Sequence, residues 1–120
     1  MATHVRLVGG SQSAQSYSGT IEIKDERAKP NVGYGTICDD YFDDREAIVI
    51  CKMLGFNYGI ARIGAHFGRG TGKIVMDDLK CHGEELSITK CKRRSDGRHN
   101  CDHGEDAGVE CSHEIIRGGH

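Results

Sequence analysis

The sequence predicts a small α+β domain that disulfide bonds stabilise. Three observations lead to this prediction: short segments of alternating polar and apolar residues, one segment with helical periodicity, and an even number of cysteines. The chain has 120 residues with 17 glycines and six cysteines, and 37% of its residues are hydrophobic. Globular proteins average roughly 45–50%, so we expect cross-links to supplement a lean core.

Five segments have the pattern expected of β-strands, because polar and apolar residues alternate between glycines or polar loops. We expect strands at 5–8, 19–23, 34–38, 73–76 and 107–111. The second and third of these are expected to form a hairpin. Loops are predicted at 11–18, 24–33 and 80–104, with a short helical turn at 84–91.

One helix is predicted over residues 44–54. Asp43 is suited to be its N-cap, and Glu46 follows three residues later, as a capping box requires. Apolar residues recur at helical spacing between 47 and 54, and Cys51 is one of them. Gly55 then provides a residue able to end the helix. We therefore expect Cys51 to tie the buried face of this helix to a distant part of the chain.

The cysteines indicate three disulfide bonds and an oxidising, extracellular compartment. None of them belongs to a Cys-x-x-Cys pair, which disfavours a redox-active dithiol or a zinc knuckle. Six cysteines allow fifteen pairings, and the count alone does not choose among them. They are Cys38, Cys51, Cys81, Cys91, Cys101 and Cys111.

An ordered set of motifs covers nearly the whole chain: Val5–Gly10, Gly35–Asp40, Ala47–Phe56, Phe67–Ile74, Met76–Cys81 and His99–Cys111. Together they resemble the scavenger receptor cysteine-rich (SRCR) domain family, in its six-cysteine group. The resemblance implies a curved antiparallel sheet of about six strands that cradles one α-helix. It also selects one pairing of the cysteines: Cys38 with Cys101, Cys51 with Cys111, and Cys81 with Cys91.

The resemblance places a single domain at residues 5–112. Residues 1–4 are expected to be an N-terminal extension with an added start, and 113–120 a linker or tag remnant. No signal-peptide pattern is visible, and no apolar run approaches the ~18 residues of a membrane span. We expect a domain cut from a larger protein, either secreted or part of a membrane protein's ectodomain, that does not itself enter the membrane.

Acidic residues fall in adjacent pairs, and a hard divalent cation between carboxylates would relieve their repulsion. The resemblance implies that Asp39, Asp40 and Glu105 ligate Ca²⁺ or Mg²⁺, and the implied Cys38–Cys101 bond would bring them together. A second site would use Asp77, Asp78 and Asn100. Solvated acids are the alternative in both cases. Helix capping explains Asp43, first-turn dipole stabilisation explains Asp44, and a structural turn explains Asp106.

Basic residues are the candidate ligand-binding groups. Such a surface beside a bound cation favours polyanions, namely sulfated glycans, modified lipoprotein and microbial surfaces, or acidic patches on extracellular proteins. Lys90 and Lys92 are interpreted as part of a solvated face. Nucleic acid is disfavoured because no aromatic residues are interleaved for base stacking. The candidates are Arg62 and Arg69 in glycine-rich loops, and Arg93, Arg94 and Arg98 between cysteines.

One stretch departs from the family. Its bacteria-binding segment begins near Gly19, where this chain has Thr20 in place of an arginine and Tyr34 in place of a tryptophan. The intervening loop, 24–33, is also longer. The family resemblance therefore does not imply that this chain binds microbes through this stretch.

These observations predict a non-catalytic extracellular module of the scavenger or pattern-recognition type, acting in innate immunity through cation-dependent binding. The alternative is a spacer or protein-interaction module of a larger secreted or membrane-bound protein, such as a mosaic protease or an amine oxidase. A third hypothesis is a thiol- or zinc-dependent protein using Cys101, His99 and His103. It is disfavoured because three disulfide bonds would leave no thiol, and no nucleophile elbow or phosphate loop is present.

Overall fold

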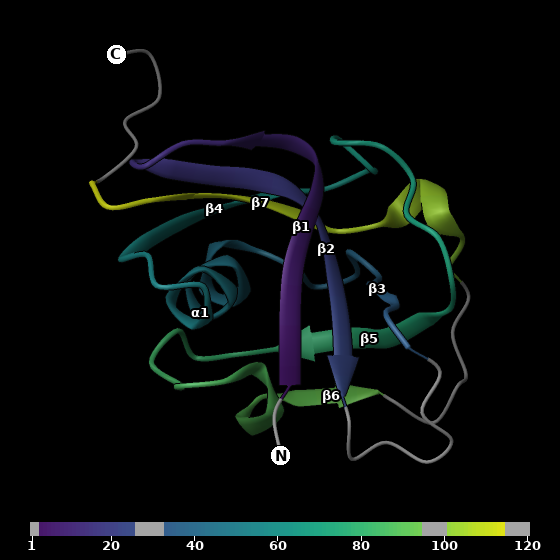
Figure 1. The fold of residues 1–120 in the computed structure, drawn as a ribbon. Coiled ribbons are helices and arrows are strands. Elements are labelled where there is room, and N and C mark those ends of the chain that lie inside the picture. The colour runs from purple at the N-terminus through teal and green to yellow at the C-terminus, as the bar shows by residue number, and fades with distance from the viewer. Residues whose placement is uncertain (1–2, 26–32, 95–100, 115–120) are drawn as a thin grey trace.

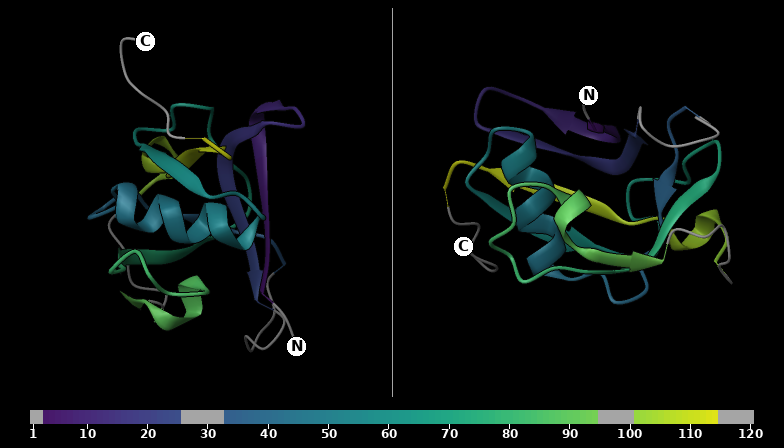
Figure 2. Two further views of the ribbon diagram at one scale, coloured as in Figure 1. Left: turned by 90° about the vertical axis from the view of Figure 1, so that its left-hand side faces the viewer. Right: turned by 90° about the horizontal axis from the view of Figure 1, so that it is seen from below.

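Two β-sheets and one α-helix make up the described part of this computed structural model, which covers residues 3–25, 33–94 and 101–114. Helix α1 lies between the β4–β7 side of the larger sheet and the smaller sheet (Figures 1 and 2). The expected α+β fold is confirmed. Its elements are β1 (Thr3–Gln12), β2 (Ser16–Asp25), β3 (Thr36–Ile37), α1 (Asp44–Met53), β4 (Tyr58–Arg62), β5 (Ile74–Lys80), the 3₁₀ turn η1 (Ile88–Lys90), β6 (Lys92–Arg94), the 3₁₀ turn η2 (His103–Glu105) and β7 (Gly108–Ser112).

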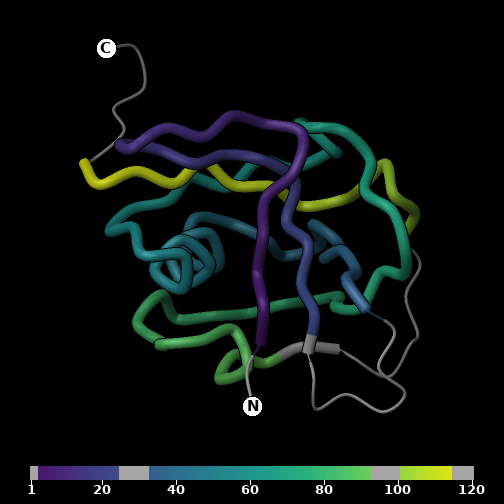
Figure 3. Tube along the Cα trace, viewed as in Figure 1, coloured from purple at the N-terminus to yellow at the C-terminus, as the bar shows by residue number. Residues whose placement is uncertain are grey.

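The larger sheet has the strand order β1-β2-β7-β4 and is antiparallel throughout. The C-terminal strand β7 returns between β2 and β4, as the tube in Figure 3 shows. β1 and β2 are each ten residues long, so part of the predicted 11–18 loop lies in strands. Gly9 of β1 pairs with Gly19 of β2, and Gln12 pairs with Tyr17. The register of the two strands shifts between these pairs. The side chains there are mostly small and polar, so the alternation that marks a strand is missing.

The smaller sheet has the order β3-β5-β6. The predicted hairpin of residues 34–38 with the second strand is wrong, because β3 pairs with β5 and is parallel to it. A single antiparallel bridge between Ile23 and Gly35 is what remains of it. The next residue, Thr36, already donates its backbone N–H to the Lys73 carbonyl at 2.9 Å. The chain thus crosses from one sheet to the other within two residues.

Helix α1 begins as predicted and ends one residue earlier. The Asp43 carboxylate accepts the Arg45 N–H at 2.9 Å, and Glu46 Oε1 accepts the Asp43 N–H at 2.7 Å. Strand β4, which follows the helix, was not predicted. At Gly59 of β4, a Cβ atom would lie 2.6 Å from the Cys51 sulfur, so only glycine permits this close approach of strand and helix.

All three implied disulfide bonds are present, with sequence separations of 63 for Cys38–Cys101, 60 for Cys51–Cys111 and 10 for Cys81–Cys91. No cysteine is free, so the thiol and zinc hypothesis is wrong for Cys101. Of its two histidines, His103 lies in η2 and His99 lies outside the described residues. The bonds join a core whose most deeply buried aliphatic side chains are Ile21, Ile23, Ile37, Val49, Ile50, Leu79, Ile88 and Val109.

Candidate functional site

The segment that follows β3 is held against η2 by three contacts of different kinds. The Cys38–Cys101 disulfide bond joins the two segments covalently. An antiparallel bridge pairs Cys38 with Asp106, and the Asp39 N–H donates to the Glu105 carbonyl at 2.8 Å. These backbone contacts fix the relative position of the side chains on both segments.

Three carboxylates predicted to ligate a cation meet at this junction. One oxygen each from Asp39, Asp40 and Glu105 lie within 4.8 Å of one another, together with the sulfur of Cys38. That sulfur is disulfide-bonded and cannot serve as a thiolate ligand. The three side chains are half-buried. Asp39 is oriented by the Gly64 N–H, which donates to its Oδ2 at 2.7 Å. An all-oxygen donor set with access for water suits Ca²⁺ or Mg²⁺.

The second predicted site is arranged differently. An oxygen of Asp77 lies within 4.8 Å of an oxygen of Asp40, in a group that shares Asp40 with the first site but contains neither Asp39 nor Glu105. Asp77 is 3% exposed, and its Oδ1 accepts the N–H of Asp78 at 2.8 Å. Asp78 belongs to no carboxylate group in the described part of the chain. Asn100 lies outside that part. We call Asp39, Asp40, Asp77 and Glu105 the acidic cluster.

The predicted arginines have different surroundings. Arg62 donates through Nε to the Glu110 carboxylate, so its charge is already paired. Arg69 is 65% exposed and lies 3.8 Å from Asp102, which is the N-cap of η2. Arg69 is therefore on the same side as Glu105. The backbones of Arg93 and Arg94 lie in β6, where Arg94 is opposite Asp77. Arg98 lies outside the described residues.

A histidine stabilises the turn that carries Glu105. His103 Nδ1 is 2.9 Å from the Asp106 carboxylate, and His103 Nε2 is 3.0 Å from the Gly72 carbonyl. Asp106 is completely buried and also accepts the Gly70 N–H at 2.7 Å. Because both ring nitrogens face acceptors, the imidazolium form fits best. The hydrogen bond to Asp106 accordingly raises the pKa of His103. These contacts agree with structural roles for His103 and Asp106.

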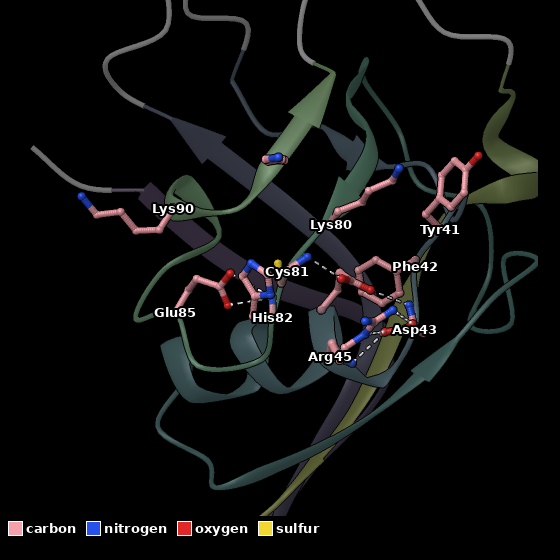
Figure 4. A pocket seen from close by; sticks show the side chains of 11 residues that line it. Tyr41, Phe42, Asp43, Arg45, Lys80, Cys81, His82, Glu85 and Lys90 are labelled. Atoms are coloured by element: carbon pink, nitrogen blue, oxygen red, sulfur yellow. Dashed lines mark hydrogen bonds and ion pairs between the residues drawn. The ribbon is translucent and has the colours of Figure 1, made fainter.

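The sequence did not single out a second group of charged residues. Lys80, Lys92 and Arg45 line a cavity beside the Cys81–Cys91 disulfide bond, with Tyr41 at its edge (Figure 4). The signal was present, because Lys80 and Lys92 directly flank the two cysteines of the shortest bridge. That bridge brings them together, but Lys92 was interpreted as part of a solvated face and Lys80 was not considered.

An α+β domain with every cysteine paired, and with charged clusters on its surface, is of the extracellular binding-module class. The chain belongs to the scavenger receptor cysteine-rich domain family, whose model matches residues 9–112. Domains of this family are extracellular or ectodomain modules. None of the helices in the described ranges has the length and apolar character that a membrane crossing requires.

Relatives of known sequence include the macrophage receptor MARCO of Mesocricetus auratus, 45% identical over 107 residues, which are 89% of this chain and 20% of that receptor. A scavenger receptor cysteine-rich domain superfamily protein of Patiria pectinifera is 42% identical over 112 residues, covering 92% of this chain and 9% of that protein. The chain thus spans a fifth or less of these relatives.

Two solved structures are also similar. The third SRCR domain of murine neurotrypsin is 39% identical, with a TM-score of 0.79 over 96% of this chain and 100% of that one. The dimeric form of the SRCR domain of mouse MARCO is 42% identical, with a TM-score of 0.71 over 90% of this chain and 94% of that one.

Proposed function

We propose that this domain binds extracellular ligands with the help of a divalent cation, Ca²⁺ or Mg²⁺, held by Asp39, Asp40 and Glu105. The cation would join the acidic cluster to anionic groups of a partner, such as sulfated glycans, modified lipoprotein, microbial surfaces or acidic protein patches. The observation that carries the proposal is the approach of three carboxylate oxygens to within 4.8 Å of one another.

The charge balance of the cluster supports a cation over solvated acids. Within the described residues, neither Asp39, Asp40 nor Glu105 forms an ion pair with a lysine or arginine. The side chains are half-buried, so water screens their repulsion less than at an open surface. A cation placed between them removes that repulsion and keeps coordination positions for water and for a ligand's anionic oxygen.

The experiment is a calcium titration of the folded domain, by calorimetry and by thermal unfolding. We expect saturable heat, and a gain of about 1.4 kcal/mol in the free energy of unfolding at a Ca²⁺ concentration tenfold above Kd. Asp39→Asn and Glu105→Gln should each abolish both signals. Glu84→Gln removes an exposed acid outside the acidic cluster and should leave both unchanged. A wild-type domain without heat and without a thermal shift in millimolar Ca²⁺ would refute the proposal.

A spacer or protein-interaction role inside a larger protein is the second candidate. It is favoured by the small share of the relatives' length that the chain covers, since a domain can serve as one unit among several. This role predicts that Ca²⁺ has no effect on partner binding. Ligand capture in Ca²⁺ compared with capture in EDTA therefore separates the two candidates.

A further inference from the structure

A cavity of about 580 Å³ opens beside the Cys81–Cys91 disulfide bond (Figure 4). Its volume falls within the range of roughly 300–1,000 Å³ typical of ligand pockets. The start of α1 forms one wall, and the end of β5, its following loop and β6 form the others. Phe42 and Cys81 are buried at its base. We call this cavity the basic pocket, because of the residues at its rim.

Two lysines occupy paired positions at that rim. Lys80 of β5 and Lys92 of β6 are direct cross-strand partners, and both side chains are exposed. Like charges opposite one another destabilise a strand pair. Within the described residues, neither lysine forms an ion pair with a carboxylate. Lys90 adds a third ammonium group to the same lining. The rim thus concentrates positive charge that an anion would neutralise.

The carboxylates in the lining are already engaged elsewhere. Glu46 is 1% exposed, and its two oxygens accept the backbone N–H groups of Asp43 and Cys81, each at 2.7 Å. Glu85 accepts the backbone N–H groups of the loop that follows Cys81. Asp43 binds the guanidinium of Arg45 at 2.8 Å and 3.2 Å, and these hydrogen bonds lower the pKa of Asp43 to about 2. The ammonium groups therefore remain available for a ligand.

Tyr41 gives the rim an aromatic surface. Its φ of +64° lies in the left-handed region, which is strained for a residue with a Cβ atom. The side chain is 66% exposed, so little burial offsets that strain. The Lys80 ammonium lies 4.3 Å from the ring centroid, and Figure 4 shows Lys80 directed toward Tyr41. A strained, exposed aromatic residue beside a charged pocket is a candidate ligand contact.

We propose that the basic pocket binds a segment of a sulfated glycan without the help of a divalent cation. A sulfate ester would lie between the ammonium groups of Lys80 and Lys92, with a sugar ring against the exposed side of Tyr41. Lys90 would meet a neighbouring sulfate. The volume is sufficient for a short oligosaccharide segment.

The chemistry of the rim favours sulfate over a peptide carboxylate. Carboxylates are recognised most specifically by the paired N–H groups of arginine, and the fork of Arg45 is already directed at Asp43. Lysine ammonium groups are compact point charges, which suit a tetrahedral anion contacted from two sides. The base also lacks an open apolar socket for a peptide side chain, because Phe42 and Cys81 are 6% and 5% exposed.

The pocket is distinct from the proposed cation site, although the two are neighbours. Tyr41 directly follows Asp40, and Lys80 lies three residues after Asp77 in the sequence. No residue of the acidic cluster lines the pocket. Binding there should therefore persist in EDTA, whereas ligand binding through a cation should not.

The test is calorimetric titration of the domain in EDTA with a heparin-derived hexasaccharide. Lys80→Gln/Lys92→Gln should weaken binding at least tenfold. A matched double variant, Lys24→Gln/Lys73→Gln, removes the same charge away from the pocket and should stay within twofold of wild type. Circular dichroism verifies that each variant is folded.

Three results would overturn the inference: no binding in EDTA, equal losses in the two double variants, or equally tight binding of a poly-glutamate peptide. The first two would show that the pocket is not a specific anion site. The third would assign it to acidic peptides. None of these results bears on the calcium titration, so the two proposals fail independently.

Discussion

The acidic cluster and the basic pocket lie next to each other, and each gathers like charges beside a disulfide bond. They differ in the sequence separation of the segments that contribute the charges. The acidic cluster depends on Cys38–Cys101, which closes a sequence separation of 63, whereas the basic pocket depends on Cys81–Cys91, with a separation of 10. The charges of the first therefore depend on long-range closure of the chain, whereas the lysines of the second come from one β5–β6 unit that packs against the start of α1.

The largest expected effect comes from removing the long cross-link. Cys38→Ala/Cys101→Ala should lower the free energy of unfolding by about 4 kcal/mol, because an open chain gains more entropy when unfolded. It should also abolish the stabilisation of the domain by Ca²⁺, because the segments that carry Asp39 and Glu105 are no longer covalently linked. Cys81→Ala/Cys91→Ala should cost about 3 kcal/mol, preserve the calcium response, and weaken hexasaccharide binding. Denaturant unfolding with and without Ca²⁺ measures both variants.

The two variants serve as controls for each other. If the short-bridge variant lost the calcium response and the long-bridge variant kept it, the assignment of each cluster to its bridge would be wrong. A loss of both ligands in both folded variants would show that the two regions form one cooperative unit.

A smaller effect is expected from pH, and it acts on the acidic side. The pKa of His103 is raised above its ordinary value of 6.5, chiefly by the hydrogen bond to Asp106, while partial burial and, to a smaller extent, nearby Arg69 oppose the shift. The folded state therefore binds the proton more tightly than the unfolded state. This contribution to stability is fully present below pH 6.5 and is lost as pH rises through the pKa of the folded state.

His103→Gln isolates this contribution. At pH 6 the variant should be about 1.5 kcal/mol less stable than wild type, because it lacks charge-assisted hydrogen bonds to Asp106 and Gly72. The difference should narrow by pH 8.5. Unfolding in EDTA at both pH values measures it without interference from a cation at Glu105. A difference that widens with pH would mean that His103 is neutral in the folded state.

The two regions also differ in how far the sequence predicted them. Helix α1 was predicted closely, because Asp43 and Glu46 form a local capping box. The acidic cluster followed from the implied disulfide pairing, since Asp39 and Asp40 adjoin Cys38. The acidic cluster includes Asp77 because β3 pairs with β5 in parallel. This pairing joins distant parts of the chain, and the alternation of polar and apolar residues does not specify it.

The basic pocket was missed for a related reason. Lys80 and Lys92 become partners only when β5 pairs with β6, and β6 is three residues long with the composition of a polar loop. Strand β4 was missed because Gly59, which sequence patterns associate with turns, is needed there for contact with Cys51. In each case the decisive information is tertiary contact rather than periodicity.

The smallest expected effect on stability is at Tyr41, between the two regions. Tyr41→Gly relieves left-handed backbone strain of about 1–2 kcal/mol. The gain is offset by the entropy of glycine in the unfolded chain, about 0.5–1 kcal/mol, and by loss of the exposed contact with Lys80, about 0.5 kcal/mol. We expect the free energy of unfolding to stay within about 0.5 kcal/mol of wild type, while hexasaccharide binding in EDTA weakens several-fold.

Tyr58→Gly is the matched control, because Tyr58 is also exposed but lies in strand β4 and is not among the residues with positive φ. Glycine there should cost about 1 kcal/mol and leave glycan binding intact. If Tyr41→Gly destabilised the domain as much as Tyr58→Gly, Tyr41 would serve the fold. The opposite pattern, near-neutral stability with weakened binding, would indicate that the strain at Tyr41 is maintained for the ligand of the basic pocket.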